Sequence, residues 1–276
     1  MKRRNWRAEI VSFTDHLLRS CQPLNFPVDL GKLAKSRAIE GIRFRPMPSD
    51  GAIEVTKDGF QVHMCSHKEQ SVRLAAVETT KLKPRERFTL AHEIIHTFFY
   101  DEQLRPIRPA PSIALLEWLC NYGAARLLLP EFLLERELGP GGRFDSLEMA
   151  QDLADSAGVS TSVVVRRLDE CRDLKQQDYA LMLFEKDESG GIRLLGACLS
   201  GVFSTMTKPK LYASPPRWVS RLAPTITSPA IGSARIPHDE RWDYVSRVVP
   251  MSKMQSRLFV EIRLVLKIKK SPSQSH

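Results

Sequence analysis

Residues 88–100 read FTLAHEIIHTFFY, and residues 92–96 within them form H-E-x-x-H, the short motif of zinc hydrolases. On an α-helix, side chains four positions apart lie on the same face. His92 and His96 can therefore offer two imidazole nitrogens to one metal ion. Glu93 is turned by about 100° from His92, which points its carboxylate toward the water that the metal would activate. Glu93 is the predicted general base and acid.

The apolar pattern around the motif indicates a helix independently. The apolar positions recur at a helical spacing, and they are Phe88, Ala91, Ile95, Phe98 and Phe99. Pro84 upstream suits a first helical turn. We expect a buried helix with both histidines near the edge of its apolar stripe. The alternative is a core helix whose two histidines bond to neighbouring residues.

The segment that follows predicts a second core helix and a third metal ligand. Residues 113–129 read IALLEWLCNYGAARLLL, with Pro130 directly after them. Glu117 and Asn121 are the conspicuous polar residues, and a carboxylate in such a helix needs a partner. Catalytic zinc usually takes three protein ligands and a water, so Glu117 is the predicted third ligand. Asn121, one turn on, would bond a ligand histidine or hold Glu117 in place. Alternatively, Glu117 is exposed or salt-bridged.

These two helices resemble those of the ImmA/IrrE-type metallopeptidases. The resemblance rests on RERFTLAHEIIHTFFYD at residues 85–101 and on ExxxNxxAAxLLLP at residues 117–130. The upstream stretch FPVDLGKLAKSRAIEGIRF, residues 26–44, is also similar to the N-terminal segment of that family. The resemblance covers roughly residues 24–175 well and the last hundred residues only in outline.

The resemblance implies a bacterial cytoplasmic protease that cuts a helix-turn-helix repressor and so relieves transcriptional repression. It implies Zn²⁺ as the cofactor and Glu93 as the catalytic carboxylate. The zinc ligands that it implies are His92, His96 and Glu117.

This chain departs from the family pattern at two positions, and both of its residues are bulkier. Ile95 stands where the family usually has glycine, and Cys120 where it has alanine. Ile95 would tighten the helix packing or narrow the cleft, which bears on catalytic efficiency more than on zinc binding.

Length and composition bound the remaining possibilities. At 276 residues with 42% hydrophobic content, two or three small domains are expected. No run of eighteen apolar residues occurs, so no membrane span is expected. The basic N-terminus has no apolar signal core after it, and we expect a cytoplasmic protein. The net charge of +9 favours nucleic acid or an acidic partner, unless the basic residues are simply scattered.

The cysteines agree with a reducing compartment. Their number is odd and no C-x-x-C pair occurs, which indicates reduced thiols. The five are Cys21, Cys65, Cys120, Cys171 and Cys198.

Upstream of the motif we expect two helices and a small sheet. Residues 5–19 form an amphipathic pattern, and residues 27–38 a shorter helix that Asp29 caps. A strand is expected near residues 42–45 and a hairpin before the strand 60–66. His63, Cys65 and His67 alternate along that last strand and would share one of its faces. They could form a soft metal site or line the cleft, or the pattern could arise by chance.

Downstream, residues 101–112 hold three prolines in six residues and should form a loop bordering the cleft. A short helix to Leu138 and the linker at residues 139–142 would end the first domain. Residues 146–172 have the outline of a helix-turn-helix. Its second helix would expose residues of both charge signs, which disfavours DNA and favours a structural or docking role. They include Ser162, Arg166, Arg167, Asp169 and Glu170.

From residue 178 the apolar period changes from that of a helix to that of a strand. Strands are expected at residues 179–184, 192–199 and 259–268, with long loops and one helix between residues 205 and 240. An antiparallel sheet with helices on one side follows. Family members of similar length carry a GAF-like sensor fold in this place.

Together these features predict an α+β protein with three parts. Residues 1–140 would form a mainly helical, zincin-like metallopeptidase domain with a small sheet. Residues 141–176 would form the helix-turn-helix segment, and residues 177–276 the α+β GAF-like domain. The predicted function is a zinc-dependent endopeptidase that cleaves a helix-turn-helix repressor and switches on a stress, DNA-damage or mobile-element response. The alternative is a non-proteolytic regulator or an antitoxin-like binding protein, without a membrane partner in either case.

Overall fold

The computed structural model describes most of the N-terminal half in full and the C-terminal part as strands. The described ranges are 4–67, 69–108, 110–139, 147–171, 179–186, 192–199, 230–234, 242–250 and 257–266. They fall into two compact units, Met1–Glu137 with Asp152–Val164 and Leu138–Gln151 with Val165–His276. No helix in these ranges is long and apolar enough to cross a membrane.

The first unit contains the helix with the motif, the helix with Glu117 and three others. Their bounds are α1 (Trp6–Cys21), α2 (Leu30–Lys35), α3 (Pro84–His96), α4 (Ile113–Leu128) and α5 (Glu131–Leu138). Local hydrogen bonds explain where they begin. Asp29 caps α2 by accepting from the Gly31 amide at 2.9 Å, as its sequence position predicts. Before α3, the Lys83 amide donates to the Glu86 carboxylate at 2.8 Å.

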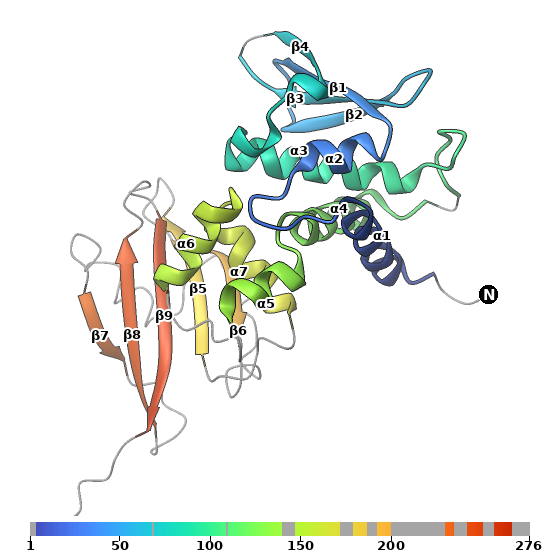
Figure 1. Cartoon of the computed structure of the whole chain (residues 1–276). Helices are drawn as coiled ribbons and strands as arrows, with labels where there is room; N and C mark the ends of the chain where they lie inside the picture. Colours follow the sequence, from blue (N-terminus) through green and yellow to red (C-terminus); the bar gives the residue numbers. More distant parts are fainter. Residues whose placement is uncertain are drawn as a thin grey trace, which may run out of the picture. The chain divides into compact units, whose positions relative to one another are not determined.

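A four-stranded sheet lies beside α3. Its strands are β1 (Ile39–Arg45), β2 (Gly51–Val55), β3 (Phe60–Cys65) and β4 (Gln70–Arg73), in the order β2-β3-β1-β4. β1 and β3 are parallel, whereas β2–β3 and β1–β4 are antiparallel. The predicted hairpin is therefore confirmed as β2–β3. The edge strand β2 contacts α3 (Figure 1), which brings the start of β2 to the motif.

Helices α3 and α4 pack closely because one offers a glycine where the other offers an isoleucine. A Cβ built on Gly123 would lie 2.8 Å from Ile95 Cδ1 and 3.1 Å from Ile10 Cγ2. Both Ile95 and Ile10 are fully buried. The bulk of Ile95 thus fills the core between the helices and does not narrow a cleft.

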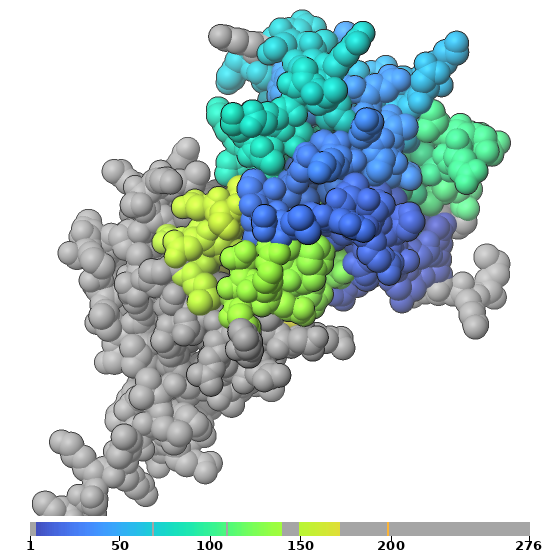
Figure 2. Space-filling view, in the orientation of Figure 1, coloured from blue at the N-terminus to red at the C-terminus, as the bar shows by residue number. Residues whose placement is uncertain are grey.

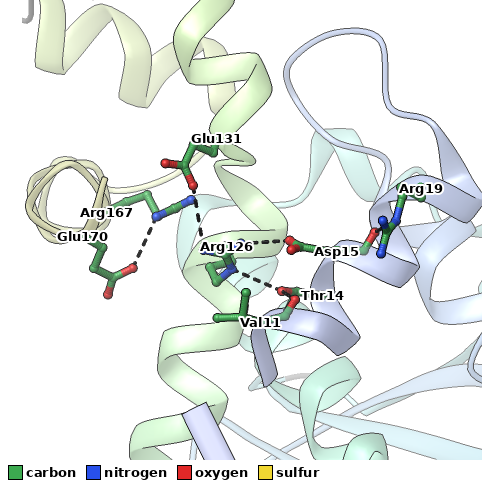
Figure 3. A network of polar contacts seen from close by, with 8 residues as sticks. All are labelled: Val11, Thr14, Asp15, Arg19, Arg126, Glu131, Arg167 and Glu170. Carbon is green, nitrogen blue, oxygen red and sulfur yellow. Dashed lines mark hydrogen bonds and ion pairs between the residues drawn. The ribbon is translucent and has the colours of Figure 1, made fainter. Parts of the chain in front are cut away.

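Arg126 of α4, whose side chain is 12% exposed, bonds to helix α1. Arg126 donates from Nη2 to Asp15 Oδ1 at 2.8 Å and from Nε to Thr14 Oγ1 at 3.2 Å (Figure 3). Glu131 lies 4.0 Å from the same guanidinium. These contacts join α4 to α1 near the C-terminal end of α4.

Helix α5 is joined to the chain that follows α1. Arg136 donates from Nη1 to the carbonyl oxygen of Leu24 and, at 3.3 Å, from Nη2 to Asn25 Oδ1. In the space-filling view, the green surface of α5 borders the blue surface of the N-terminal residues (Figure 2). The N-terminal helix and α5 therefore belong to the same packed unit.

A buried arginine anchors the start of α3. Arg87 is fully buried and donates to the carbonyl oxygens of Thr79 at 2.6 Å and Val28 at 2.9 Å. Burial lowers its pKa to about 10, opposed by the charge of Asp29. Gly158, whose φ is +62°, approaches closely, since a Cβ there would lie 3.0 Å from Arg87 Nε.

The C-terminal strands form a second, antiparallel sheet. They are β5 (Tyr179–Lys186), β6 (Ile192–Leu199), β7 (Ala230–Ala234), β8 (Trp242–Pro250) and β9 (Arg257–Leu266), in the order β6-β5-β9-β8-β7. The prediction of an antiparallel sheet is confirmed. The prediction of loops and one helix throughout residues 205–240 is wrong at β7, whose sequence AIGSA lacks a period-2 apolar pattern. The helix expected near residues 215–222 lies outside the described residues.

Two helices occupy the segment predicted as a helix-turn-helix. They are α6 (Leu147–Ala157) and α7 (Thr161–Glu170), with Gly158 in the turn as expected. The sequence places Arg167 on an exposed face, but its side chain is 1% exposed and lies 3.6 Å from Glu170 (Figure 3). The apolar pattern predicts the wrong face for Arg167, because a charged side chain beside an opposite charge can be buried. The predicted linker lies outside the described residues from residue 140 on. The helices and the two sheets confirm the predicted α+β class.

We expect Gly123→Ala to destabilise the first unit by about 1–3 kcal/mol, the usual cost of overpacking. At an open helix position the same change would stabilise by up to about 1 kcal/mol. Urea unfolding followed by circular dichroism measures the difference. In an Ile95→Ala background, the added methyl should cost much less, because the two closest atoms, Cδ1 and Cγ1 of Ile95, are gone. Equal costs in both backgrounds would contradict the assigned contact.

Candidate metal centre

The structure brings the predicted ligand side chains together at the end of α3. His92 Nε2 and His96 Nε2 lie 2.9 Å apart. The carboxylate of Glu117 on α4 approaches both, with Oε2 at 3.3 Å from His92 Nε2 and Oε1 at 3.7 Å from His96 Nε2. Two imidazole nitrogens and a carboxylate converging on one point form a donor set that suits zinc.

Asn121 fixes the tautomer of His92. His92 Nδ1 lies 3.0 Å from Asn121 Oδ1, and since a carbonyl oxygen only accepts, the proton is on Nδ1. The lone pair of His92 is therefore on Nε2, the nitrogen that faces His96 and Glu117. An outer partner of this kind can prepare a histidine for a metal, and the contact with His92 is one of the two that the sequence predicts for Asn121.

Both histidines are held in the neutral form. Burial lowers the pKa of His92, although Glu117 and Asn121 oppose the shift. Burial, followed by the charge of His92, lowers the pKa of His96 to about 4. At neutral pH the contacts of Glu117 with the rings are thus not ion pairs. Neutral imidazole is the form that binds metal.

Glu93 lies beside this group in an apolar setting. Glu93 is 4% exposed. Burial raises the pKa of its carboxyl group to about 8, and the negative charge of Glu117 contributes a smaller part of the shift. A carboxyl group with a pKa near neutrality can both accept and donate a proton. Gly51 of β2 sets its position, because a Cβ there would lie 2.7 Å from Glu93 Oε1 and 2.4 Å from Thr89 Cγ2.

Two residues of the centre were not singled out for it from the sequence. Gly51 reads as an ordinary turn residue, and only the fold shows its contact with Glu93. Cys120 was noted as a departure from the family pattern without a role. Its Sγ and ring nitrogens of His92 and His96 all lie within 4.8 Å of one another. The spacing of Cys120 three positions after Glu117 was the signal available, since it places both on one face.

The first two turns of α4 are more exposed than the sequence predicts. Ile113 is 81% exposed and Trp118 48%, and the Glu117 side chain between them is 50% exposed. The apolar run predicts burial throughout, but only the part from Leu119 onward packs into the core. The centre is therefore open to solvent on the side of Glu117.

His63 and Cys65 of β3 and His67 after it do not assemble a second metal site. His63 is buried and bonds Glu54 Oε2 at 2.7 Å, while Cys65 Sγ donates to the Met47 carbonyl at 3.3 Å. His67 lies beyond the end of β3. Within the described ranges, the donor atoms that all lie within 4.8 Å of one another belong to His92, His96 and Cys120. Glu117 is not in this group, although its carboxylate approaches both histidines.

Comparison with known proteins identifies a family match and a similar fold. Residues 55–169 match the family model described as the IrrE N-terminal-like domain, a peptidase family. No curated protein matches the chain. A solved Mycobacterium tuberculosis transcriptional regulator is similar in fold, with a TM-score of 0.53 and 16% identity over 92% of this chain and 75% of that one.

We expect Asn121→Ala to lower the affinity for zinc by about 10–100-fold, the usual effect of removing the partner of a ligand histidine. Competition against a chromogenic chelator measures the affinity, and thermal unfolding checks the fold. Asn121→Asp, which keeps an acceptor at the same atom, is the matched control and should retain tight binding. An unchanged affinity in Asn121→Ala would show that Asn121 does not prepare His92.

Proposed function

Residues 55–169 form an IrrE N-terminal-like domain, and on that premise we propose that the chain is a zinc-dependent endopeptidase. Its substrate would be a helix-turn-helix transcriptional repressor, whose cleavage switches on a stress, DNA-damage or mobile-element response. The observation that carries the proposal is the placement of Glu93. A purely structural metal site has no use for a buried, unligated carboxyl group with a pKa of about 8.

The metal would be held by His92, His96 and Glu117. The support is the convergence of their donor atoms, with His92 Nε2 and Glu117 Oε2 at 3.3 Å, and the lone pair that Asn121 directs inward. A zinc ion there supplies a Lewis acid, which polarises the scissile carbonyl and lowers the pKa of a water toward about 7. The half-exposed Glu117 leaves the centre accessible to a peptide.

Glu93 would perform both proton transfers. Its carboxylate takes the proton from the attacking water and then hands it to the amine that leaves. Burial raises the pKa of Glu93 to about 8, which makes its carboxylate a stronger base for the first transfer and stabilises the protonated form that donates in the second. The contact with Gly51 holds the carboxylate at the ligand histidines, so no side-chain ordering is required during the reaction.

The remaining parts of the chain would select the substrate and control access to the centre. We keep residues 1–140 as the peptidase domain, residues 141–176 as a helix-turn-helix-like docking segment and residues 177–276 as a GAF-like regulatory domain. The burial of Arg167 leaves fewer cations on α7 for phosphates, which disfavours direct DNA binding. A repressor substrate and an odd number of cysteines without a C-x-x-C pair suit the cytoplasm.

The main alternative is a non-proteolytic regulator or an antitoxin-like protein that binds its partner through the same fold. It predicts tight binding of the repressor without cleavage and no effect of changes at Glu93. The presence of a gene for a helix-turn-helix repressor beside this one would supply the partner for the test.

We expect Glu93→Gln to keep zinc and fold but to lose cleavage of that repressor by at least about 10²–10⁴-fold. Glutamine preserves the shape of the side chain and cannot take up the proton. Electrophoresis of the repressor after incubation measures cleavage, and metal analysis measures zinc. The His92→Ala, His96→Ala double variant is the control for zinc loss. Cleavage at the wild-type rate by Glu93→Gln would remove Glu93 from the mechanism.

We expect Gly51→Ala to slow cleavage by about 10–100-fold, because a new methyl group pushes the Glu93 carboxylate from its place. Zinc content should not change, since Gly51 contacts no predicted ligand. The matched control is Ala52→Gly, which alters the same strand without approaching Glu93. If both variants cleave as fast as the wild type, β2 does not position the base.

A further inference from the structure

We propose that Cys120 is itself a metal ligand, so that His92, His96, Glu117 and Cys120 form a four-donor site closed to water at rest. The inference rests on the metal site proposed above and adds a donor and a resting state to it. It starts from the position of the Cys120 thiol, which shares a 4.8 Å cluster with ring nitrogens of both histidines.

The distances are close to those that coordination needs. With zinc–sulfur and zinc–nitrogen bonds of about 2.3 and 2.0–2.1 Å, neighbouring donors of a tetrahedral site lie roughly 3.5 Å apart. For the two histidines and the Cys120 thiol, whose donor atoms lie within 4.8 Å of one another, the donors therefore need shifts of only about 1 Å. Cys120 lies three positions after Glu117, so both project from α4 toward α3.

Burial distinguishes the thiol from the carboxylate. Cys120 is fully buried, and its Sγ has no hydrogen bond to any residue in the described part of the chain. The Glu117 side chain is 50% exposed and can be solvated when it is not bound. Loss of the metal therefore leaves the thiol without any partner, whereas Glu117 has water. Of the two, Glu117 is the donor that can leave to admit water and substrate.

The other described thiols lack this setting. Cys65 is exposed and bonds the Met47 carbonyl, and Cys21 lies half-buried on α1. Cys120 is the thiol that faces two neutral imidazoles across the α3–α4 contact. Alanine at this place would be smaller and would offer no donor.

A thiolate donor changes which metal ions the site prefers. Sulfur ligands favour zinc, cobalt and cadmium over manganese and magnesium, and binding displaces the thiol proton to solvent. With four protein donors, the position that a hydrolytic site leaves to water is taken. The resting protein would hold its metal firmly and cleave slowly until Glu117 moves aside.

Cobalt substitution tests the sulfur ligand directly. The full chain is stripped of metal with a chelator and loaded with Co²⁺ alone. We expect a sulfur-to-cobalt charge-transfer absorption in the near ultraviolet, lost in both Cys120→Ala and Cys120→Ser and kept in the control Cys65→Ser. The visible bands of bound cobalt should persist in every one of these variants, because His92, His96 and Glu117 remain. Cys120→Ala should also cleave the repressor several-fold faster than the wild type.

The outcomes separate this inference from the proposed function. Visible cobalt bands without the charge-transfer absorption in the wild type would overturn the thiolate ligand and leave the peptidase proposal intact. The absorption with equal cleavage rates in wild type and Cys120→Ala would overturn the closed resting state. No cobalt bound by the wild type, or binding that survives in the His92→Ala, His96→Ala variant, would refute the metal site and this inference with it.

Discussion

The close approach of α3 and α4 is the contact on which the candidate centre depends. The two helices bring different halves of the donor set, histidines from one and a carboxylate from the other. They meet because Ile95 fits against the bare backbone of Gly123, with 2.8 Å from Ile95 Cδ1 to the place where a Cβ would stand. A pair of helices held farther apart would leave Glu117 out of reach of His92. The packing of two residues with no chemical role thus sets the geometry of those that have one.

Burial of the centre determines which of its side chains carry a proton. Burial keeps His92 and His96 neutral and raises the pKa of Glu93 to about 8. In the proposed mechanism, the same apolar setting prepares two groups to bind a cation and a third to move a proton. Asn121 adds the orientation of one ring. These effects come from the environment, and they explain why a five-residue motif needs the rest of the fold to act.

Much of the first unit could be predicted from the sequence, because its signals are local. The spacing of His92, Glu93 and His96 fixes a helix face, Asp29 is a good cap, and the turn residues before β3 mark a hairpin. The contact of Gly51 with Glu93 could not be predicted, since it joins a strand to a helix 42 positions later through space alone. Arg167 and the exposed start of α4 misled for the same reason. Charge and hydrophobicity indicate average burial, and the neighbours of a side chain decide its actual burial.

The anchoring of Arg87 also has a consequence for how the domain can vary. Its guanidinium joins Val28, before the four-stranded sheet, to Thr79, after it. The sheet is therefore an insert whose two ends are clasped by one side chain of α3. Insertions or deletions in a turn distant from Gly51, such as the one between β2 and β3 at the other end of β2, can change the outer edge of the insert while the clasp keeps α3 in place. The domain is modular at that edge, where a new binding surface could be grafted without rebuilding the helix pair.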